Sequence, residues 1–379
     1  MKASRRSEVD PFIVMDVMEA ARAAEAAGRR IIHMEVGQPG TPAPAIARKA
    51  LAAAMEAGPL GYTVALGRPD LRARIAQLYR DWHGIDLNPD RVIVTAGASG
   101  AFLLAFSAFF DAGDRVAAGL PGYPSYRQIL KALSLQPVDI DTTAENRFQP
   151  VPEQLPDDIA GLIVASPANP TGTMLDQPAL AALIGAAQDR GAAFISDEIY
   201  HGIDYDRAPV TALAVSDDVC VINSFSKYFS MTGWRIGWMV VPEAIIRTVE
   251  RLAQNMFICP PHASQVAALA SMDATQELEA NKAVYAENRR LMIEGLPRAG
   301  FANFAPPDGA FYIYADVSDL TDDALALSRE ILDRAGVAVT PGLDFDPQRG
   351  HRTLRFSYAR STADIVEGLA RLADWRASR

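Results

Sequence analysis

The sequence predicts an α/β protein with a mostly parallel sheet, and two observations support this fold class. Short apolar runs alternate with helix-like segments through most of the chain. Buried strands that alternate with helices are typical of a parallel sheet covered by helices. The final third follows another pattern, in which a long charged helix precedes further short strands. Because 379 residues exceed the usual size of one domain, we expect a larger α/β domain and a smaller α+β domain.

The strands of the larger domain are expected where the short apolar runs occur. They are Val92–Thr95, Arg115–Ala118, Gly161–Ala165, Ala192–Ser196, Val219–Asn223 and Ile236–Val241. Helices between them are predicted at Ser99–Phe110, Pro124–Leu133 and Gln177–Arg190, the last of which ends at Gly191. Nearer the N-terminus, the alanine-rich stretches AARAAEAAG and AIARKALAAAMEAG predict helices. Ligands of such folds bind at the carboxyl ends of the strands.

The final third predicts the smaller domain, with an antiparallel sheet. A long helix is expected at about Glu277–Ala299, and a shorter one near Asp322–Ala335. Strands are expected in the stretches DGAFYIYADV, GVAVTPG and RTLRFSYA. The proline-containing stretches FICPPHAS and FAPPDGA are the expected loop junctions.

Charge and composition exclude several classes of protein. The formal net charge is −10, whereas binding to nucleic acid or to an anionic membrane requires basic surfaces. Val92–Phe110 is uncharged and near the length of a membrane span, but TAGASG interrupts it, so we interpret it as a strand, a loop and a buried helix. The chain has two cysteines, and no apolar stretch follows its start, MKASRRSEVD. These features favour a cytoplasmic protein with reduced thiols and no secretory signal.

Motifs for other cofactors are absent or weak. There is no G-x-G-x-x-G or Walker-type loop, so the use of a nicotinamide or of ATP is not expected. Glu198 and His201 have the i, i+3 spacing of some metal-binding helix bundles. This spacing has no second copy, and the other histidines lack ligand spacing, so no metal site is expected.

Polar side chains follow four of the expected strands, where packing does not readily explain them. They are Ser99 in AGASG, Asn169 in SPANPTG, Asp197 and Tyr200 in DEIYHG, and Ser224 and Lys227 in NSFSK. Taken alone, each has an ordinary explanation, such as a capping serine, a turn asparagine or a solvated lysine. Their joint occurrence at the carboxyl ends of one sheet favours a binding site.

These groups together meet the needs of pyridoxal phosphate. The amine of Lys227 can form a Schiff base with an aldehyde, and the carboxylate of Asp197 can pair with a protonated ring nitrogen. Asn169 and Tyr200 can hydrogen-bond a phenolate oxygen. A helix N-terminus, serine hydroxyls and Arg235 can hold a phosphate dianion. The stretch SFSKYFSMTGWRIGW therefore predicts Lys227 as the Schiff-base lysine and Arg235 as a phosphate ligand.

The order and spacing of SPANPTG, DEIY and SFSK…MTGWRIG resemble the class I/II aminotransferases among the fold-type-I pyridoxal phosphate enzymes. The resemblance extends over nearly the whole chain and is nearest to the prokaryotic aspartate-aminotransferase-like subgroup. It implies a large cofactor-binding domain at 45–280, with a mostly parallel seven-stranded sheet between helices. Residues 281–379 would form the small α+β domain, together with the N-terminal segment 1–44.

The resemblance also implies roles for individual residues. Lys227 would carry the cofactor as a Schiff base and act as general base, with Asp197 at the ring nitrogen and Tyr200 at the ring oxygen. Further cofactor contacts would come from Ala98, Ser99, Gly100, Tyr123, Asn169, Ser224, Ser226 and Arg235, and from Tyr62 of the neighbouring subunit. The substrate carboxylate would contact Gly37, Asn169 and Arg355. Without the resemblance, Arg355 could lie on the solvent face of an edge strand, and Ser99 could simply cap a helix.

The implied activity is that of a homodimeric aminotransferase with shared active sites. It would move an amino group from an L-amino acid to a 2-oxo acid by a ping-pong mechanism through pyridoxamine phosphate. Two alternatives are a β-lyase or related enzyme with the same cofactor, and a regulatory protein with an aminotransferase-like domain. Gln38 and Gly40 replace the acidic residues of many relatives, and Ser99 stands where some have lysine. The sequence therefore does not identify the amino donor.

Overall fold

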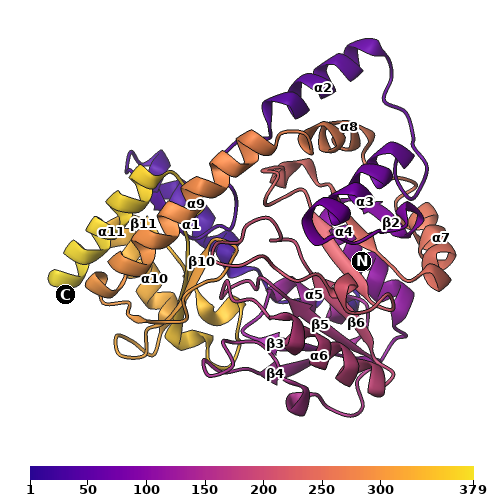
Figure 1. The fold of residues 1–379 in the computed structure, drawn as a ribbon. Helices are drawn as coiled ribbons and strands as arrows, with labels where there is room; N and C mark the ends of the chain where they lie inside the picture. The colour runs from indigo at the N-terminus through magenta and orange to yellow at the C-terminus, as the bar shows by residue number, and fades with distance from the viewer.

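A seven-stranded sheet forms the centre of the larger part of the molecule (Figure 1). The computed structural model describes residues 1–379 and gives the strand order β2-β8-β7-β6-β5-β3-β4. The strands are β2 Val92–Thr95, β3 Arg115–Leu120, β4 Gln136–Asp141, β5 Gly161–Ala165, β6 Ala193–Asp197, β7 Cys220–Ser224 and β8 Gly237–Val240. Neighbouring strands are parallel except at β8, which is antiparallel to both β2 and β7. The predicted mostly parallel sheet is confirmed.

Helices cover both faces of this sheet because successive strand residues point to opposite sides. In β6, Phe194 belongs to the core beneath α6, whereas Ile195 belongs to a second core that contains Phe102 of α4. The first face is covered by α3 Pro69–His83 and α6 Gln177–Asp189, and the second by α4 Gly97–Phe109, α5 Pro124–Ala132 and α7 Ile246–Met256. Both faces are apolar, which explains the continuous apolar runs in the sequence.

A four-stranded antiparallel sheet lies in the C-terminal part, on the left in Figure 1. Its order is β12-β13-β10-β9, with β9 Asn303–Phe304, β10 Tyr312–Asp316, β12 Thr340–Pro341 and β13 Thr353–Ser357. The helices of this part are α1 Ile13–Ala26, α9 Thr275–Gly295, α10 Ala324–Ala335 and α11 Thr362–Ala377. A separate parallel pair joins β1 Ile32–His33 to β11 Val337–Ala338. The start of the chain therefore packs with its end.

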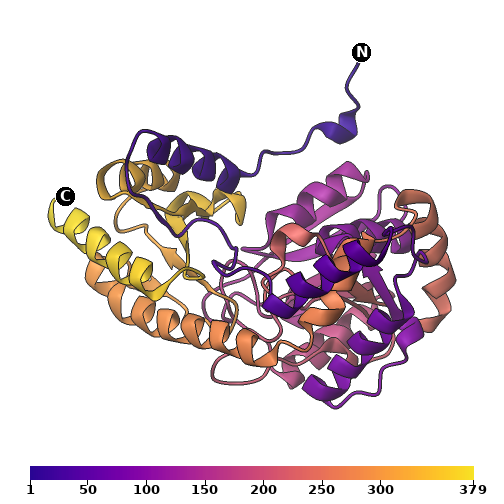
Figure 2. The same ribbon diagram turned by 90° about the horizontal axis from the view of Figure 1, so that it is seen from above.

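Two helices connect these parts. The first is the alanine-rich α2 Ala45–Ala57, which follows the N-terminal segment and packs against α8 His262–Ser271. The second is α9, which extends from the larger part to the C-terminal part (Figure 2). No helix of the chain combines the length and the apolar character needed to cross a membrane.

Some details of the predicted elements are wrong. The helix expected from Ser99 begins at Gly97, and the long helix expected to reach Ala299 ends at Gly295, shortly before a proline. Strand β4 escapes prediction because it lies at the sheet edge, contains a proline and is mostly solvated. Val337–Ala338, expected in the antiparallel sheet, pairs with β1 instead, and only Thr340–Pro341 joins that sheet.

Candidate active site

The predicted polar residues meet at the edge of the large sheet that is formed by the carboxyl ends of its parallel strands. The parallel strands β2, β5, β6 and β7 all end at this edge, where they lead into the loops that carry these residues. Strand β8 runs the other way, and its first residue, Gly237, pairs with both Thr95 and Ser224. The reversed direction brings Arg235, just before β8, to the same edge. A single antiparallel strand thus adds a cation to a site built by parallel strands.

A cavity of about 200 Å³ lies at this edge. Eleven of the predicted site residues line it: Gly37, Ala98, Ser99, Tyr123, Asn169, Tyr200, Ser224, Ser226, Lys227, Arg235 and Arg355. Asp197, the last residue of β6, is not among the lining residues and is 3% exposed. Gly100 is buried in α4 and does not reach the cavity, and Tyr62 lies outside it with 82% of its surface exposed.

One corner of the cavity is suited to an anion. The first turn of α4 presents free backbone N–H groups there, and the helix dipole adds partial positive charge. The Arg235 guanidinium is packed against this turn so closely that a Cβ on Gly97 would lie 2.5 Å from its Nη2 atom. The hydroxyl of Ser224 donates to that of Ser226 at 2.9 Å, beside the same corner. This corner can hold a phosphate group.

Lys227 extends into the centre of the cavity. Its Nζ donates to the carbonyl oxygen of Gly37 at 2.7 Å and lies 5.6 Å from the centre of the Tyr200 ring. Its position away from bulk water, together with the charges of Arg355 and Arg235, lowers the pKa of the amine to about 8. The ordinary alternative of a solvated lysine is therefore wrong, because Lys227 lines the cavity. A neutral amine in this position can act as nucleophile or base.

Asp197 is a buried carboxylate without a cation in hydrogen-bond contact. It accepts hydrogen bonds from the hydroxyl of Tyr126 and from the backbone N–H of Ile199. Burial raises its pKa to about 6, and the Tyr126 bond opposes part of that rise. A cationic group placed above Asp197 would stabilise its ionised form.

Arg355 and Asn169 form the opposite wall. The Arg355 side chain is 3% exposed on β13, which is an inner strand of its sheet, so the edge-strand alternative is wrong. Its Nη1 donates to Oδ1 of Asn169 at 2.9 Å, and its Nη2 donates to the carbonyl of Glu35. Its buried Nε has no partner. A planar carboxylate could take up this free donor capacity.

The backbone at Gly37 passes directly over a tyrosine. A Cβ on Gly37 would lie 1.6 Å from the hydroxyl oxygen of Tyr312, so only glycine fits without displacing that side chain. The Tyr312 hydroxyl forms a 2.8 Å hydrogen bond with the hydroxyl of Tyr200, and its ring lies 4.5 Å below the Arg355 guanidinium. Tyr312 thereby links the arginine to the centre of the cavity.

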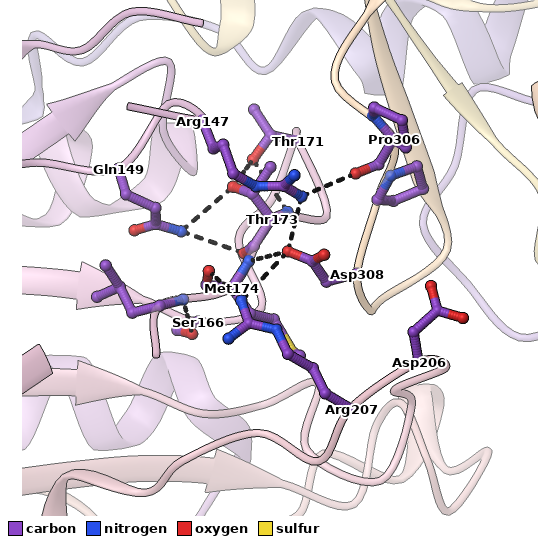
Figure 3. Close-up of polar contacts among 12 residues, drawn as sticks. Arg147, Gln149, Ser166, Thr171, Thr173, Met174, Asp206, Arg207, Pro306 and Asp308 are labelled. Atoms are coloured by element: carbon purple, nitrogen blue, oxygen red, sulfur yellow. Dashed lines mark hydrogen bonds and ion pairs between the residues drawn. The ribbon is translucent and has the colours of Figure 1, made fainter. Parts of the chain in front are cut away.

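The loop that carries Asn169 is held from the C-terminal part (Figure 3). Oδ2 of Asp308 accepts hydrogen bonds from the Met174 backbone N–H and from Arg147, both at 2.9 Å. The carbonyl of Gly172 accepts the backbone N–H groups of Asp308 and Gly309, both at 2.9 Å. These bonds join the Asn169 loop of the larger part to residues 308 and 309 of the C-terminal part, and so fix the position of Asn169.

Some residues around the cavity were not predicted from the sequence. Tyr126 contacts Asp197, Tyr312 contacts Tyr200, and the N-terminal residues Phe12, Val14 and Met15 line the cavity. Tyr126 follows Tyr123 by three residues at the start of α5, so helical spacing could have placed both at the site. Nothing local in the sequence brings the N-terminal residues there, because that contact depends on the tertiary fold.

The fold and the cavity together indicate an enzyme that uses an aldehyde cofactor bearing a phosphate. The family model for aminotransferase class I and II matches residues 29–372. A valine–pyruvate aminotransferase from Mycobacterium tuberculosis is 47% identical, over 100% of this chain and 99% of that protein. A protein of known structure from Silicibacter pomeroyi is 67% identical with a TM-score of 0.96, each chain being covered completely. An aspartate aminotransferase from Thermus thermophilus, solved with maleate, is 30% identical with a TM-score of 0.93, over 99% and 100% of the two chains.

The chain therefore belongs to the class I and II aminotransferases. It is a pyridoxal phosphate-dependent aminotransferase, as the sequence predicts, and the lyase and regulatory alternatives are not supported. The residues present fit this cofactor. The corner formed by α4 and Arg235 suits its phosphate, and Lys227 suits its aldehyde. The carboxylate of Asp197, which has no cation in hydrogen-bond contact, suits a protonated ring nitrogen.

Proposed function

We propose that the enzyme moves the amino group of an apolar 2-amino acid, such as valine, to a small 2-oxo acid, such as pyruvate. The observation that carries this proposal is the composition of the cavity wall. Phe12, Val14, Met15 and Val36 line it together with Ile129. A valine–pyruvate aminotransferase with 47% identity supports the same substrate class.

The charges around the cavity also favour an apolar donor. Its cationic lining residues are Lys227, Arg235 and Arg355. With Lys227 engaged in the chemistry, Arg235 at the phosphate corner and Arg355 at the α-carboxylate, none remains for a second carboxylate. A donor such as aspartate would bury that charge against apolar side chains, which is costly. An aliphatic side chain would instead gain from the same contacts.

In this proposal, Lys227 moves the proton at the substrate Cα. Pyridoxal phosphate supplies, when bound, a cationic ring that stabilises the negative charge left on this carbon. The pKa of Lys227, about 8, leaves part of the amine neutral near pH 7 and thus able to accept the proton. The carbonyl of Gly37, 2.7 Å from Nζ, limits the positions that the amine can take.

The neighbouring side chains orient the reactants. Asp197, held by the Tyr126 hydroxyl, would keep the ring nitrogen protonated. Asn169 and Tyr200 would donate to the ring oxygen. The remaining proposed cofactor contacts are Ala98, Ser99, Gly100, Tyr123, Ser224, Ser226 and Arg235. Since Gly100 lies in α4 away from the cavity, its contribution would be confined to the backbone of that helix.

Arg355 would bind the substrate α-carboxylate, assisted by Gly37 and Asn169. Its Nη1 is already oriented by Oδ1 of Asn169, and its ring contacts with Tyr312 and Phe345 lie at 4.5 and 4.6 Å. These contacts fix the plane of the guanidinium before the substrate arrives. A preoriented arginine would turn the Cα–H bond of every donor toward the Lys227 amine.

The proposed active unit is a cytoplasmic homodimer. Tyr62 is 82% exposed, and Val64, Met256 and Ile258 are further exposed hydrophobic residues of the larger part. Tyr62 would reach the phosphate corner of the neighbouring subunit. Within each subunit, we propose a large domain at 45–280 and a small domain made of 281–379 and the segment 1–44, which β1 joins to β11.

A panel of half-reactions tests the proposed substrate class. The holoenzyme is mixed with single amino acids, and the change in the cofactor absorption spectrum is followed with time. Valine and similar donors should react at least about 10-fold faster than aspartate or glutamate, in line with the discrimination that an apolar pocket provides. An acidic donor that reacts faster than every apolar one would contradict the proposal.

A further inference from the structure

Helix α1 begins without a cap from its own sequence. Its N-cap residue is Phe12, which has no side-chain acceptor, and Pro11 precedes it. The first N–H groups of a helix need acceptors from outside the helix. Serine, threonine, asparagine or aspartate at the cap position normally supplies one. In α1 that position holds an aromatic ring that lines the active-site cavity.

Asp344 supplies the missing acceptors from the other end of the chain. Its Oδ1 accepts the N–H of Ile13 and its Oδ2 accepts the N–H of Val14, both at 2.8 Å. The Asp344 residue is 4% exposed. Its negative charge also lies at the positive end of the helix dipole. One carboxylate therefore satisfies two helix-start donors across more than three hundred residues of sequence.

The segment around Asp344 is itself tied to the active site. The Arg127 guanidinium of α5 donates to the carbonyls of Asp344, at 3.0 Å, and Phe345. The Phe345 ring packs on the Arg355 guanidinium, with 4.6 Å between the ring centre and the Cζ atom. A shift of this segment would therefore move both α1 and the proposed carboxylate-binding arginine.

The start of α1 crosses the cavity between two anchors. On one side, Oδ2 of Asp10 accepts hydrogen bonds from Gln128 and Lys131 of α5, both at 3.0 Å. On the other side lies Asp344. Between the anchors, Phe12 meets the Tyr123 ring edge to face, with 6.3 Å between the ring centres. We call residues 10–15 the strap.

We propose that Asp344 is a positioning residue that holds the strap, and with it Phe12, Val14 and Met15, against the side chain of the amino donor. This role rests on the proposed apolar substrate class. The acceptor comes from a different segment, since Phe12 at the cap position lines the cavity and has no acceptor of its own. Asp344 lines neither the cavity nor the phosphate corner and acts through the strap.

Amide hydrogen exchange of the holoenzyme tests whether Asp344 holds the strap. In Asp344→Ala, the amides at the start of α1 should exchange roughly 2- to 30-fold faster, the range expected for the loss of a helix cap. Asp344→Asn keeps one neutral acceptor oxygen and should give a smaller increase. Asp323→Ala is the matched control, because Asp323 caps α10 through the N–H of Ala326 at 2.9 Å and does not line the cavity. Unchanged exchange at α1 in Asp344→Ala would overturn the proposal.

Kinetics with two donors separate positioning from simple helix capping. In this proposal, the side chain of valine contacts the strap, whereas alanine has almost no side chain to do so. Asp344→Ala should therefore raise KM for valine several-fold more than for alanine, with smaller changes in kcat. Equal losses for both donors, even with faster exchange, would overturn the positioning role. If the wild-type enzyme instead preferred acidic donors, the proposed substrate class would fail while the exchange result would still stand on its own.

Discussion

Burial acts in opposite directions on the two titratable side chains at the centre of the site. It lowers the pKa of Lys227 to about 8 and raises that of Asp197 to about 6. In both cases the charged form is poorly solvated away from water. The lowered pKa leaves a larger fraction of the Lys227 amine neutral near pH 7, and the neutral amine is the form that acts as nucleophile and base. The ionised form of Asp197, in turn, would be stabilised by a nearby cation, which a protonated ring nitrogen would provide.

Replacement of Lys227 by alanine should abolish covalent attachment of the cofactor. The wild-type protein, treated with borohydride in the presence of pyridoxal phosphate, should gain the mass of one cofactor per chain, and Lys227→Ala should not. Lys282 is a useful control because it is a partly buried lysine that pairs with Asp204 at 3.1 Å and does not line the cavity. Lys282→Ala should be labelled as in the wild type. A reducible adduct at full yield in Lys227→Ala would rule out the assigned lysine.

Replacement of Arg355 by lysine should damage substrate use far more than cofactor binding. Lysine keeps the charge but loses the planar pair of donors that matches a carboxylate. Lysine also cannot repeat the contacts of Arg355 with Asn169 and Glu35 together. The resulting loss of orientation should lower kcat/KM about 10²-fold, alike for valine and alanine, because both donors carry the same α-carboxylate.

Two measurements accompany this variant. The cofactor spectrum should stay near that of the wild type, and Arg352→Lys, on a surface arginine paired with Asp322 at 2.7 Å, should leave both donors unaffected. Selective loss for one donor would instead make Arg355 a residue of side-chain specificity.

Among the secondary-structure elements, those buried on both faces were the easiest to predict. β5 was predicted to the residue and β2 likewise, because each is an unbroken apolar run that ends in polar or small residues. The edge strand β4 was missed because half of its positions face solvent, so it lacks that run. The direction of β8 could not be predicted either. Its apolar sequence satisfies the sheet equally well in both directions, and only the chain connection decides.

The short pairing between β1 and β11 carries a pH-dependent contribution to stability. His33 at the end of β1 is hydrogen-bonded to Glu35 at 2.8 Å and to Glu25 at 3.0 Å. The bond to Glu35 is the largest cause of a raised pKa, about 9. Since the folded protein binds the His33 proton more tightly than the unfolded chain, this stabilisation is complete below pH 6.5 and is lost as the pH rises through about 9.

The free energy of unfolding in urea, measured at pH 6.5 and pH 9.5, checks this contribution. The wild type should lose on the order of 1–2 kcal/mol from this histidine over that interval, because solvent screens part of the interaction of the half-buried ring, and His33→Gln should lose correspondingly less. An identical pH dependence in His33→Gln and the wild type would show that the histidine does not contribute.

At the scale of the whole molecule, the sequence placed the site residues that follow strands but not those that arrive from elsewhere. Asn169, Asp197, Ser224 and Lys227 could be found because strand order alone brings their loops to one edge. Tyr312 and the strap reach the cavity through the packing of the C-terminal part on the sheet. That packing depends on side-chain fit across segments hundreds of residues apart, which no local pattern encodes.

The remaining predicted residue, Tyr62, has no contact with the cavity of its own chain. The residue is 82% exposed, as expected of an interface residue in an isolated subunit. If Tyr62 completes the phosphate corner of a neighbouring subunit, each active site combines Lys227 of one chain with Tyr62 of the other. The two residues should then complement each other between chains but not within one chain.

Mixed dimers with defined mutations distinguish these arrangements. A dimer of one Lys227→Ala chain and one Tyr62→Ala chain, purified through two different affinity tags, should contain one intact site and one doubly altered site. It should therefore show roughly half of the wild-type activity per dimer at limiting cofactor, since a two-fold dimer has two equivalent sites. The control dimer pairs a wild-type chain with a chain that carries both substitutions. It has the same altered residues, yet neither of its sites combines an intact Lys227 with an intact Tyr62 across the interface, so its activity should fall to that of the Tyr62→Ala enzyme or below. If Tyr62 acted within its own chain, the outcome would be reversed, and the control dimer would be the active one.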